Sequence, residues 1–120
     1  MKVKKKAINY RKRLNELIAR CRRAGIKVRF VSSGELKDYG AMNDEAAKPI
    51  GFRRLPDDTV LIDRNMRTKI QYECVEHEVE EMIDMEYKHK DYWHAHLIAL
   101  NAEVHGFTPF VRKKLNKGMK

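Results

Sequence analysis

Residues 75–84 read VEHEVEEMID, ten positions that hold five carboxylates and one histidine. Apolar residues recur through this stretch and its flanks at the spacing of an α-helix, which we expect to run from about residue 66 to 87. Asn65 is placed to cap the start of this helix. Such a segment is either an acidic helix facing water or one wall of a metal site, and the position of each carboxylate around the helix distinguishes the two.

A helical wheel at about 100° per residue separates the acids into two groups. One arc, which we expect to face water, holds Glu73, Glu76, Glu80, Asp84 and Tyr87. The opposite, core-facing half holds Tyr72, Cys74, Val75, Val79, Met82, Ile83 and Met85. Glu78 falls inside the apolar half. Burying a lone carboxylate is costly, so Glu78 requires a partner or a raised pKa, and it is our candidate for a catalytic base.

His77 and Glu81 lie at the border between the two arcs, four residues apart and therefore one turn apart on the same face. They are either a surface ion pair or two metal ligands. The next predicted helix, residues 92–105, carries His96 and Glu103 two turns apart on a face shared with Trp93, Ala99 and Leu100. Two antiparallel helices joined by residues 88–91 would bring the predicted metal-site residues His77, Glu81, His96 and Glu103 around one ion. In this set Glu103 is either a fourth ligand or a group behind the ligands.

The other candidate ligands have simpler interpretations. Cys74 precedes His77 by three residues and is either a fourth ligand or a small buried apolar side chain. We expect His89, His94 and His105 to lie at the surface or to cap helices.

The flanking sequence predicts a single α+β domain over residues 1–120. We expect a helix over 7–24 that ends at Gly25, a strand over 26–31, and a loop with one short helical turn over 32–48. Residues 50–64 predict a hairpin that turns at Pro56-Asp57-Asp58, which gives a small antiparallel sheet ahead of the two packed helices. The basic ends, residues 1–6 and 112–120, are predicted to be flexible tails.

Charge is distributed unevenly along the chain. Residues 1–30 carry a net charge of +11 and residues 106–120 add +5, whereas residues 72–105 carry −7. Basic ends of this kind suggest a phosphate-bearing partner such as nucleic acid. The residues we assign to this alternative role are Lys4, Lys5, Lys6, Arg11, Arg13, Arg20 and Arg23. The basic helix could instead pack over the acidic one.

Composition excludes several other classes. No apolar run reaches the ~20 residues needed to cross a bilayer, so we expect no membrane association. The basic N-terminus lacks the apolar segment of a signal peptide. Two cysteines, Cys21 and Cys74, are too few for a disulfide framework and predict reduced thiols in a cytoplasmic protein.

The order of elements and the His77-Glu78-x-x-Glu81 motif resemble a minimal zincin metallopeptidase domain, with the ImmA/IrrE-type and phage-borne short metallopeptidases nearest in layout. The resemblance covers about residues 26–105. It implies that His77 is a ligand, that Glu78 is the general base, and that a downstream helix supplies a further ligand, His96 or Glu103. A divalent metal ion, zinc by this resemblance, would then activate a water for attack on a peptide or protein substrate.

Glu81 departs from the family pattern, which has histidine at this position. A carboxylate also binds zinc, but a carboxylate-rich set shifts the preference toward Mn²⁺ or Fe²⁺. The sequence therefore predicts a metal-dependent hydrolase, with two alternatives: a nucleic-acid-binding module, or a zincin fold that has lost the reaction. We expect the walls of the pocket to come from residues 32–48 and 50–63.

Overall fold

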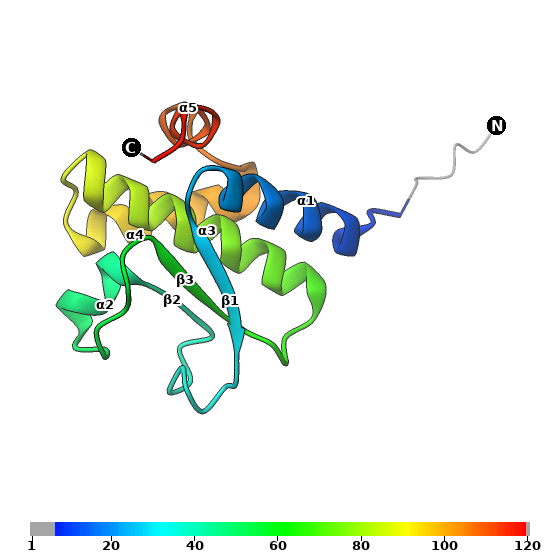
Figure 1. The fold of residues 1–120 in the computed structure, drawn as a ribbon, viewed down its shortest axis with the longest axis horizontal. Helices are drawn as coiled ribbons and strands as arrows, with labels where there is room; N and C mark the ends of the chain where they lie inside the picture. Colours follow the sequence, from blue (N-terminus) through cyan, green and yellow to red (C-terminus); the bar gives the residue numbers. More distant parts are fainter. Residues whose placement is uncertain (1–6, 120) are drawn as a thin grey trace.

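The computed structural model describes residues 7–119 and confirms the α+β class (Figure 1). In chain order the elements are α1 (Tyr10–Arg23), β1 (Lys27–Val31), β2 (Ala41–Asn43), α2 (Asp44–Ile50), β3 (Thr59–Asp63), α3 (Thr68–Tyr87), α4 (Tyr92–His105) and α5 (Pro109–Lys117). The long helix α3 runs through the middle of the molecule. The sheet lies on one side of α3, and α1 and α5 lie on the other.

The sheet is mixed rather than antiparallel. Its strand order is β1-β3-β2, with β1 parallel and β2 antiparallel to β3. The predicted hairpin over residues 50–64 is wrong, because β3 follows the turn at Asp57-Asp58 but residues 50–56 on the other side of the turn form no strand. Every residue of β3 is buried, as expected for a central strand that pairs on both sides.

The predicted loop over residues 32–48 holds two regular elements, β2 and most of α2. Asn43 ends β2 and begins α2, because its side-chain oxygen accepts a hydrogen bond from the backbone N–H of Ala46 at 2.9 Å. Gly51 ends α2 in the left-handed conformation, with φ at 76°. Both elements are too short to produce a periodic pattern in the sequence.

The predicted helix boundaries agree with the structure to within a few residues at most ends. α1 buries Leu14, Leu17, Ile18 and Cys21, and Gly25 follows it with φ at 97°. α4 spans the predicted residues 92–105. The predicted cap at Asn65 is wrong: α3 begins at Thr68, its N-cap Arg67 makes no side-chain cap, and the Asn65 N–H bonds the Asp63 carboxylate.

α3 is buried on more sides than the helical wheel allowed. The predicted water-facing acids Glu76, Glu80 and Asp84 are only 6%, 0% and 1% exposed. The wheel assumes one buried face, whereas here the sheet, α1, α4 and α5 all pack on the same helix. The apolar half is as predicted, since Val75, Val79, Met82 and Ile83 are fully buried.

The buried acids Glu80 and Asp84 have different environments. Glu80 accepts hydrogen bonds from the backbone N–H and the hydroxyl of Thr108, the N-cap of α5, at 2.8 and 2.9 Å. Neither carboxyl oxygen of Asp84 has a hydrogen-bond partner among the described residues. Burial, together with the neighbouring Glu80, raises the pKa of Asp84 to about 8, so this group is neutral at physiological pH.

The C-terminal segment is a packed helix, so the prediction of a flexible tail over residues 112–120 is wrong for 112–119. α5 buries Val111 and Leu115 in the main core. Beyond the helix, the Met119 N–H donates to the Ala24 carbonyl, and the Tyr87 hydroxyl donates to the Met119 carbonyl. The other predicted tail, residues 1–6, lies outside the described residues, as does Lys120.

Candidate metal centre

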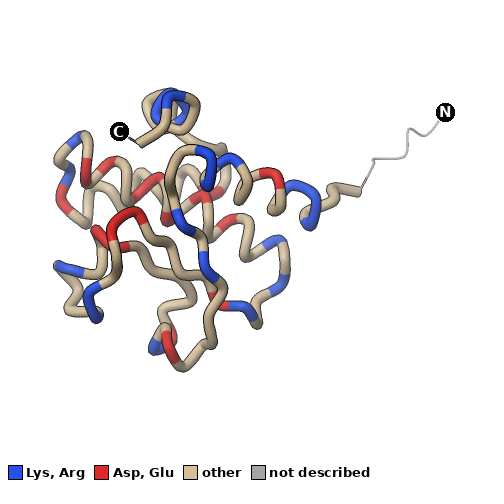
Figure 2. Tube along the Cα trace, in the orientation of Figure 1, with Lys and Arg blue, Asp and Glu red and all other residues tan. Residues whose placement is uncertain are grey.

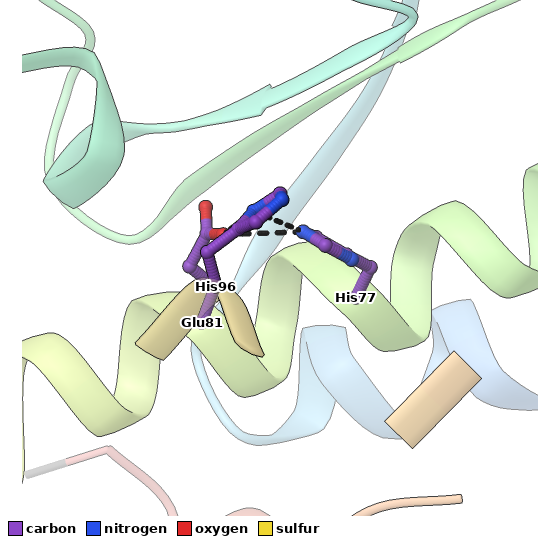
Figure 3. Close-up of side chains that lie close together, drawn as sticks. All are labelled: His77, Glu81 and His96. Carbon is purple, nitrogen blue, oxygen red and sulfur yellow. Dashed lines mark hydrogen bonds and ion pairs between the residues drawn. The ribbon is translucent and has the colours of Figure 1, made fainter. Parts of the chain in front are cut away.

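Three potential ligand atoms converge between α3 and α4 (Figure 3). His77 Nε2 lies 3.1 Å from Glu81 Oε2, one turn along α3. His96 Nδ1 reaches in from α4 and lies 2.8 Å from the same Glu81 oxygen and 3.2 Å from His77 Nε2. Residues 19 positions apart in the chain thus form a triangle of two imidazole nitrogens and one carboxylate oxygen.

The triangle has the chemistry and nearly the dimensions of a metal-binding face. In a tetrahedral zinc site with bonds of about 2.0–2.1 Å, the ligand atoms are about 3.3 Å apart. The sides of the triangle, 2.8, 3.1 and 3.2 Å, are slightly shorter. Small outward movements of the side chains would therefore admit an ion. Two histidines and one carboxylate also form a common ligand set of catalytic zinc sites, which leave a fourth position open.

Glu103 is outside the triangle. Its Oε1 lies 2.6 Å from Nδ1 of His77, on the side of the ring opposite Nε2. A carboxylate in this position accepts a hydrogen bond from Nδ1–H and leaves Nε2 free to bind an ion, an arrangement common behind histidine ligands. The sequence predicted Glu103 either as a fourth ligand or as a group behind the ligands, and its contact with His77 Nδ1 corresponds to the second role.

Glu78 is buried beside the triangle, as the wheel predicted, with Oε2 3.9 Å from His77 Nε2. Its partner is Asn43, whose side-chain NH₂ donates to Glu78 Oε1 at 3.1 Å and to Glu81 Oε1 at 3.0 Å. The cap of α2 fixes the amide orientation, because the oxygen must face the Ala46 N–H and the NH₂ must therefore face the carboxylates. Asn43 thus holds both carboxylates in place.

Burial and the clustering of acids shift two pKa values in the ion-free site. Burial and the charge of Glu81 raise the pKa of Glu78 to about 8. Burial alone would lower the pKa of His77, but its hydrogen bond to Glu81 and the charges of Glu78, Glu81 and Glu103 outweigh this and raise it to about 9. Without an ion, both ring nitrogens of His77 therefore carry a proton at neutral pH. A divalent cation would replace the positive charge of this imidazolium.

The ligand triangle opens into a pocket of about 230 Å³. Its walls come from the segment preceding β2, from β2 and α2, and from α4, including Tyr39, Met42, Ile50, Tyr92 and Leu100. The predicted wall over residues 32–48 contributes. Of the predicted hairpin, only Ile50 lines the pocket, because residues 51–63 run elsewhere. The pocket combines apolar walls with a few convergent polar groups, as small-molecule and substrate sites commonly do.

The remaining candidate ligands lie outside the triangle. Cys74 lines the pocket, but its Sγ contacts Met66 Sδ at 4.0 Å. His89, His94 and His105 are exposed, as predicted. Asp91 caps the start of α4, because its carboxylate accepts a hydrogen bond from the His94 backbone N–H at 2.9 Å and also lies 2.9 Å from His94 Nδ1.

Lys and Arg residues lie along α1 (Figure 2), and the four predicted nucleic-acid-binding residues that the structure describes lie near its two ends. Arg11 donates to Thr68, and Arg13 lines a hollow near Glu76, both at the beginning of α3. At the other end of α1, Arg20 donates to Asn116 of α5, and Arg23 lines a hollow with Lys117. Lys4, Lys5 and Lys6 lie outside the described residues.

Sequence reasoning missed Asn43, the residue that connects the two carboxylates with α2. An Asn-Asp pair ahead of Glu45 and two alanines is a helix-start pattern, which could have predicted the cap but not its contact with α3.

Among the described residues, no helix is long and apolar enough to cross a membrane. Comparison of the chain with protein-family models, curated proteins and solved structures gave no match.

Proposed function

We propose that this protein is a metal-dependent hydrolase that acts on a peptide or amide bond by a zincin-like mechanism. The observation that carries the proposal is the convergence of His77 Nε2, Glu81 Oε2 and His96 Nδ1 at a pocket that also contains the buried carboxyl of Glu78. A bound Zn²⁺, Mn²⁺ or Fe²⁺ would supply a Lewis acid that polarises a carbonyl oxygen and lowers the pKa of a water.

The protein residues have separate roles in this proposal. His77, Glu81 and His96 hold the ion, and Glu103 keeps the Nδ1 proton of His77 so that Nε2 stays available. Glu78 takes a proton from the attacking water and passes it to the leaving nitrogen. Without an ion, burial raises the pKa of this carboxyl to about 8, and a bound divalent cation would lower it, so that Glu78 is ionised and able to accept the proton. Asn43 keeps the Glu78 carboxyl turned toward the ligands.

Metal analysis tests the proposed ligands directly. Protein purified without a histidine tag should contain about one divalent ion per chain, as expected for a three-ligand site. Changing His77 or His96 to Ala should remove the ion. The matched control is His94→Ala, because His94 lies on the same helix as His96 but is exposed and outside the triangle. Ion-free wild-type protein, or full metal content in the His77→Ala variant, would overturn the assignment.

Activity measurements test the proposed base. The Glu78→Gln variant should retain the ion and lose hydrolysis by about 10²–10⁴-fold, the usual contribution of a general base. A broad panel of peptides and amides is the appropriate substrate set. Bound metal without hydrolysis of any member would favour the alternative of a zincin fold that has lost the reaction.

A second candidate function is nucleic-acid binding. The observation that favours it is that the basic end of α1 and the basic helix α5 lie side by side. Arg20 of α1 donates a hydrogen bond to Asn116 of α5 at 3.2 Å. Arg22, Arg23 and Lys117 line one hollow beside this contact. We define these basic residues, Arg20, Arg22, Arg23 and Lys117, as the α1–α5 basic patch. It lies away from the ligand triangle, so the two functions could coexist.

Salt dependence of nucleic-acid affinity tests the second candidate. If the patch binds phosphates, the logarithm of the affinity should fall linearly with the logarithm of the salt concentration. The Arg22→Gln and Arg23→Gln changes together should reduce that slope by about one for each arginine that binds a phosphate. Arg64→Gln and Arg67→Gln, near the start of α3, remove the same charge elsewhere. Equal effects of both pairs would count against a specific patch.

A further inference from the structure

The outer face of α4 carries a row of exposed apolar side chains. Trp93, Leu97, Leu100 and Val104 are 71%, 64%, 43% and 75% exposed. Their spacing of four, three and four residues is the alternation of the a and d positions in a coiled coil. We call these four residues the α4 stripe. All four lie on one side of the helix, along nearly its whole length.

The side of α4 opposite its buried face is apolar, and the exposed polar residues His94, Asn101 and His105 lie along one flank of the stripe. The inner face of α4 packs against α3 through Ala95, Ala99 and Ala102, which are at most 2% exposed. Surface helices of globular proteins usually pair one apolar face with a polar one. An apolar inner face combined with an apolar outer stripe is the pattern of a helix covered on both sides, and within the described residues the stripe remains uncovered.

We propose that a second copy of this chain covers the stripe, with the two α4 helices packed antiparallel about a twofold axis. The stripe is complementary to itself in this orientation. It runs from the large Trp93 through two leucines to the smaller Val104, so reversal places each tryptophan opposite a valine and each Leu97 opposite a Leu100. A twofold interface requires this kind of self-complementary surface.

The size of the stripe is consistent with a reversible dimer. The four exposed side chains offer on the order of 500 Å² per copy, so pairing buries on the order of 1,000 Å², the lower end for specific interfaces. We expect an interface of this size to dissociate in the micromolar range. Where the dissociation constant falls within that range depends on how well the side chains pack, not on the buried area. A tryptophan that each copy buries against its partner favours the tighter end of that range.

Dimerisation would also place a second chain at the edge of the metal pocket. Trp93 packs against the His96 ring, with centroids 6.5 Å apart, and Leu100 lines the pocket. The inference does not depend on the proposed hydrolase function, because the stripe contains no proposed ligand. Association can therefore be measured on protein treated with a chelator.

Trp93 is the only tryptophan in the chain, so its fluorescence reports directly on the stripe. Sedimentation and fluorescence should be followed from about 100 µM to about 0.1 µM, a range that brackets the expected dissociation constant. We expect a dimer at the high end, with Trp93 emission at shorter wavelength, and a change of both signals over the same range of dilution. A monomer throughout, with unchanged emission, would overturn the proposal.

Charge reversal within the stripe provides the variant test. Leu97→Glu should shift the dissociation constant by at least about 100-fold, because it buries two like charges near the twofold axis. The control is Ile70→Glu, which changes an apolar residue that is 39% exposed at the beginning of α3. It should leave association unchanged. Equal loss of association in both variants, or none in Leu97→Glu, would contradict the proposed interface, and circular dichroism verifies that each variant is folded.

Discussion

Asn43 is the residue on which the geometry of the candidate site depends most. It is fully buried, and its three side-chain hydrogen bonds go to Ala46, Glu78 and Glu81. One side chain thus caps α2 and holds two carboxylates that would otherwise repel each other at close range. Both N–H groups and the oxygen have a partner, so that only one lone pair of the oxygen is left without one among these three bonds.

Two substitutions separate these roles of Asn43. Asn43→Ser can keep the helix cap but cannot bridge the carboxylates, so we expect a loss of about 1–3 kcal/mol in the free energy of unfolding. Asn43→Ala loses the cap as well and should cost about 1 kcal/mol more. Urea denaturation of ion-free protein measures both. If Asn43→Ser were as stable as the wild type, the bridge would have no structural role.

Proton release should accompany metal binding at His77. Its pKa of about 9 means that Nε2 must lose a proton before it can bind an ion at neutral pH. We therefore expect the affinity to rise about tenfold per pH unit between about pH 6 and 8, and to level off above about pH 9. Calorimetry in two buffers of different ionisation enthalpy counts the protons. An affinity independent of pH would show that His77 is not a ligand; His94→Ala should leave the slope unchanged.

The residues of the site differ in how far the sequence could predict them. His77, Glu78 and Glu81 lie on one long helix, and its periodicity was sufficient to place Glu78 on the apolar side. His96 and Glu103 followed from pairing two consecutive helices. Asn43 could not be predicted, since its contact with α3 depends on how the short strand β2 joins the sheet.

At the scale of elements, α3 combines several packing surfaces. It contacts the sheet, α1 and α4, and it also contacts α5. Burial on several sides is why Glu76, Glu80 and Asp84 lie in the interior, whereas the helical wheel assigned them to water. Periodicity reports the composition of each face but not how many neighbours cover the helix. Surface acids and buried acids therefore have the same pattern in the sequence.

The Asp84→Asn variant tests the neutral state of this buried acid. In the wild type the folded protein keeps a proton on Asp84 up to about pH 8, whereas the unfolded chain releases it above about pH 4. The contribution of Asp84 to the free energy of unfolding therefore falls as the pH rises from about 4 to about 8 and is constant above about pH 8. An amide has no proton to lose.

Relative to the wild type, Asp84→Asn should therefore become progressively more stable from about pH 4 to about pH 8. Urea denaturation at several pH values measures the difference. Glu16→Gln removes a carboxylate from the exposed side of α1 and is the control for net charge. Parallel pH profiles for Asp84→Asn and the wild type would mean that Asp84 is ionised in the folded state.

At the scale of the whole molecule, α5 completes the main core from the far end of the chain. Val111, Leu115 and Met119 join the same apolar cluster as α1, β1 and α3. The sequence of this segment is dominated by its charges, so the prediction treated it as a tail. Apolar residues spaced four apart, Val111 and Leu115, were present, but one short helix offers too few positions to establish a period.

Leu115→Ala tests whether α5 is an integral part of the fold. Because Leu115 is only 4% exposed, we expect a loss of about 2–5 kcal/mol, the usual range for a leucine removed from a core. Lys113→Ala changes an exposed neighbour on the same helix and should cost less than about 0.5 kcal/mol. Thermal or urea denaturation distinguishes them. Similar stability of the two variants would mean that α5 does not contribute to the core.

The parallel pairing of β1 and β3 also has a consequence for the order of folding. β1 and β3 can pair only after residues 32–58, which connect them, have brought the chain back alongside β1. The helices α3 and α4, in contrast, are joined by the short segment 88–91. Contacts between segments close in the chain form faster than such long-range pairing. We therefore expect His77, Glu81 and His96 to meet before Asn43 arrives. If the proposed site holds an ion, a folding chain could then bind it before the pocket closes. In stopped-flow refolding, metal uptake would then precede the last structural phase.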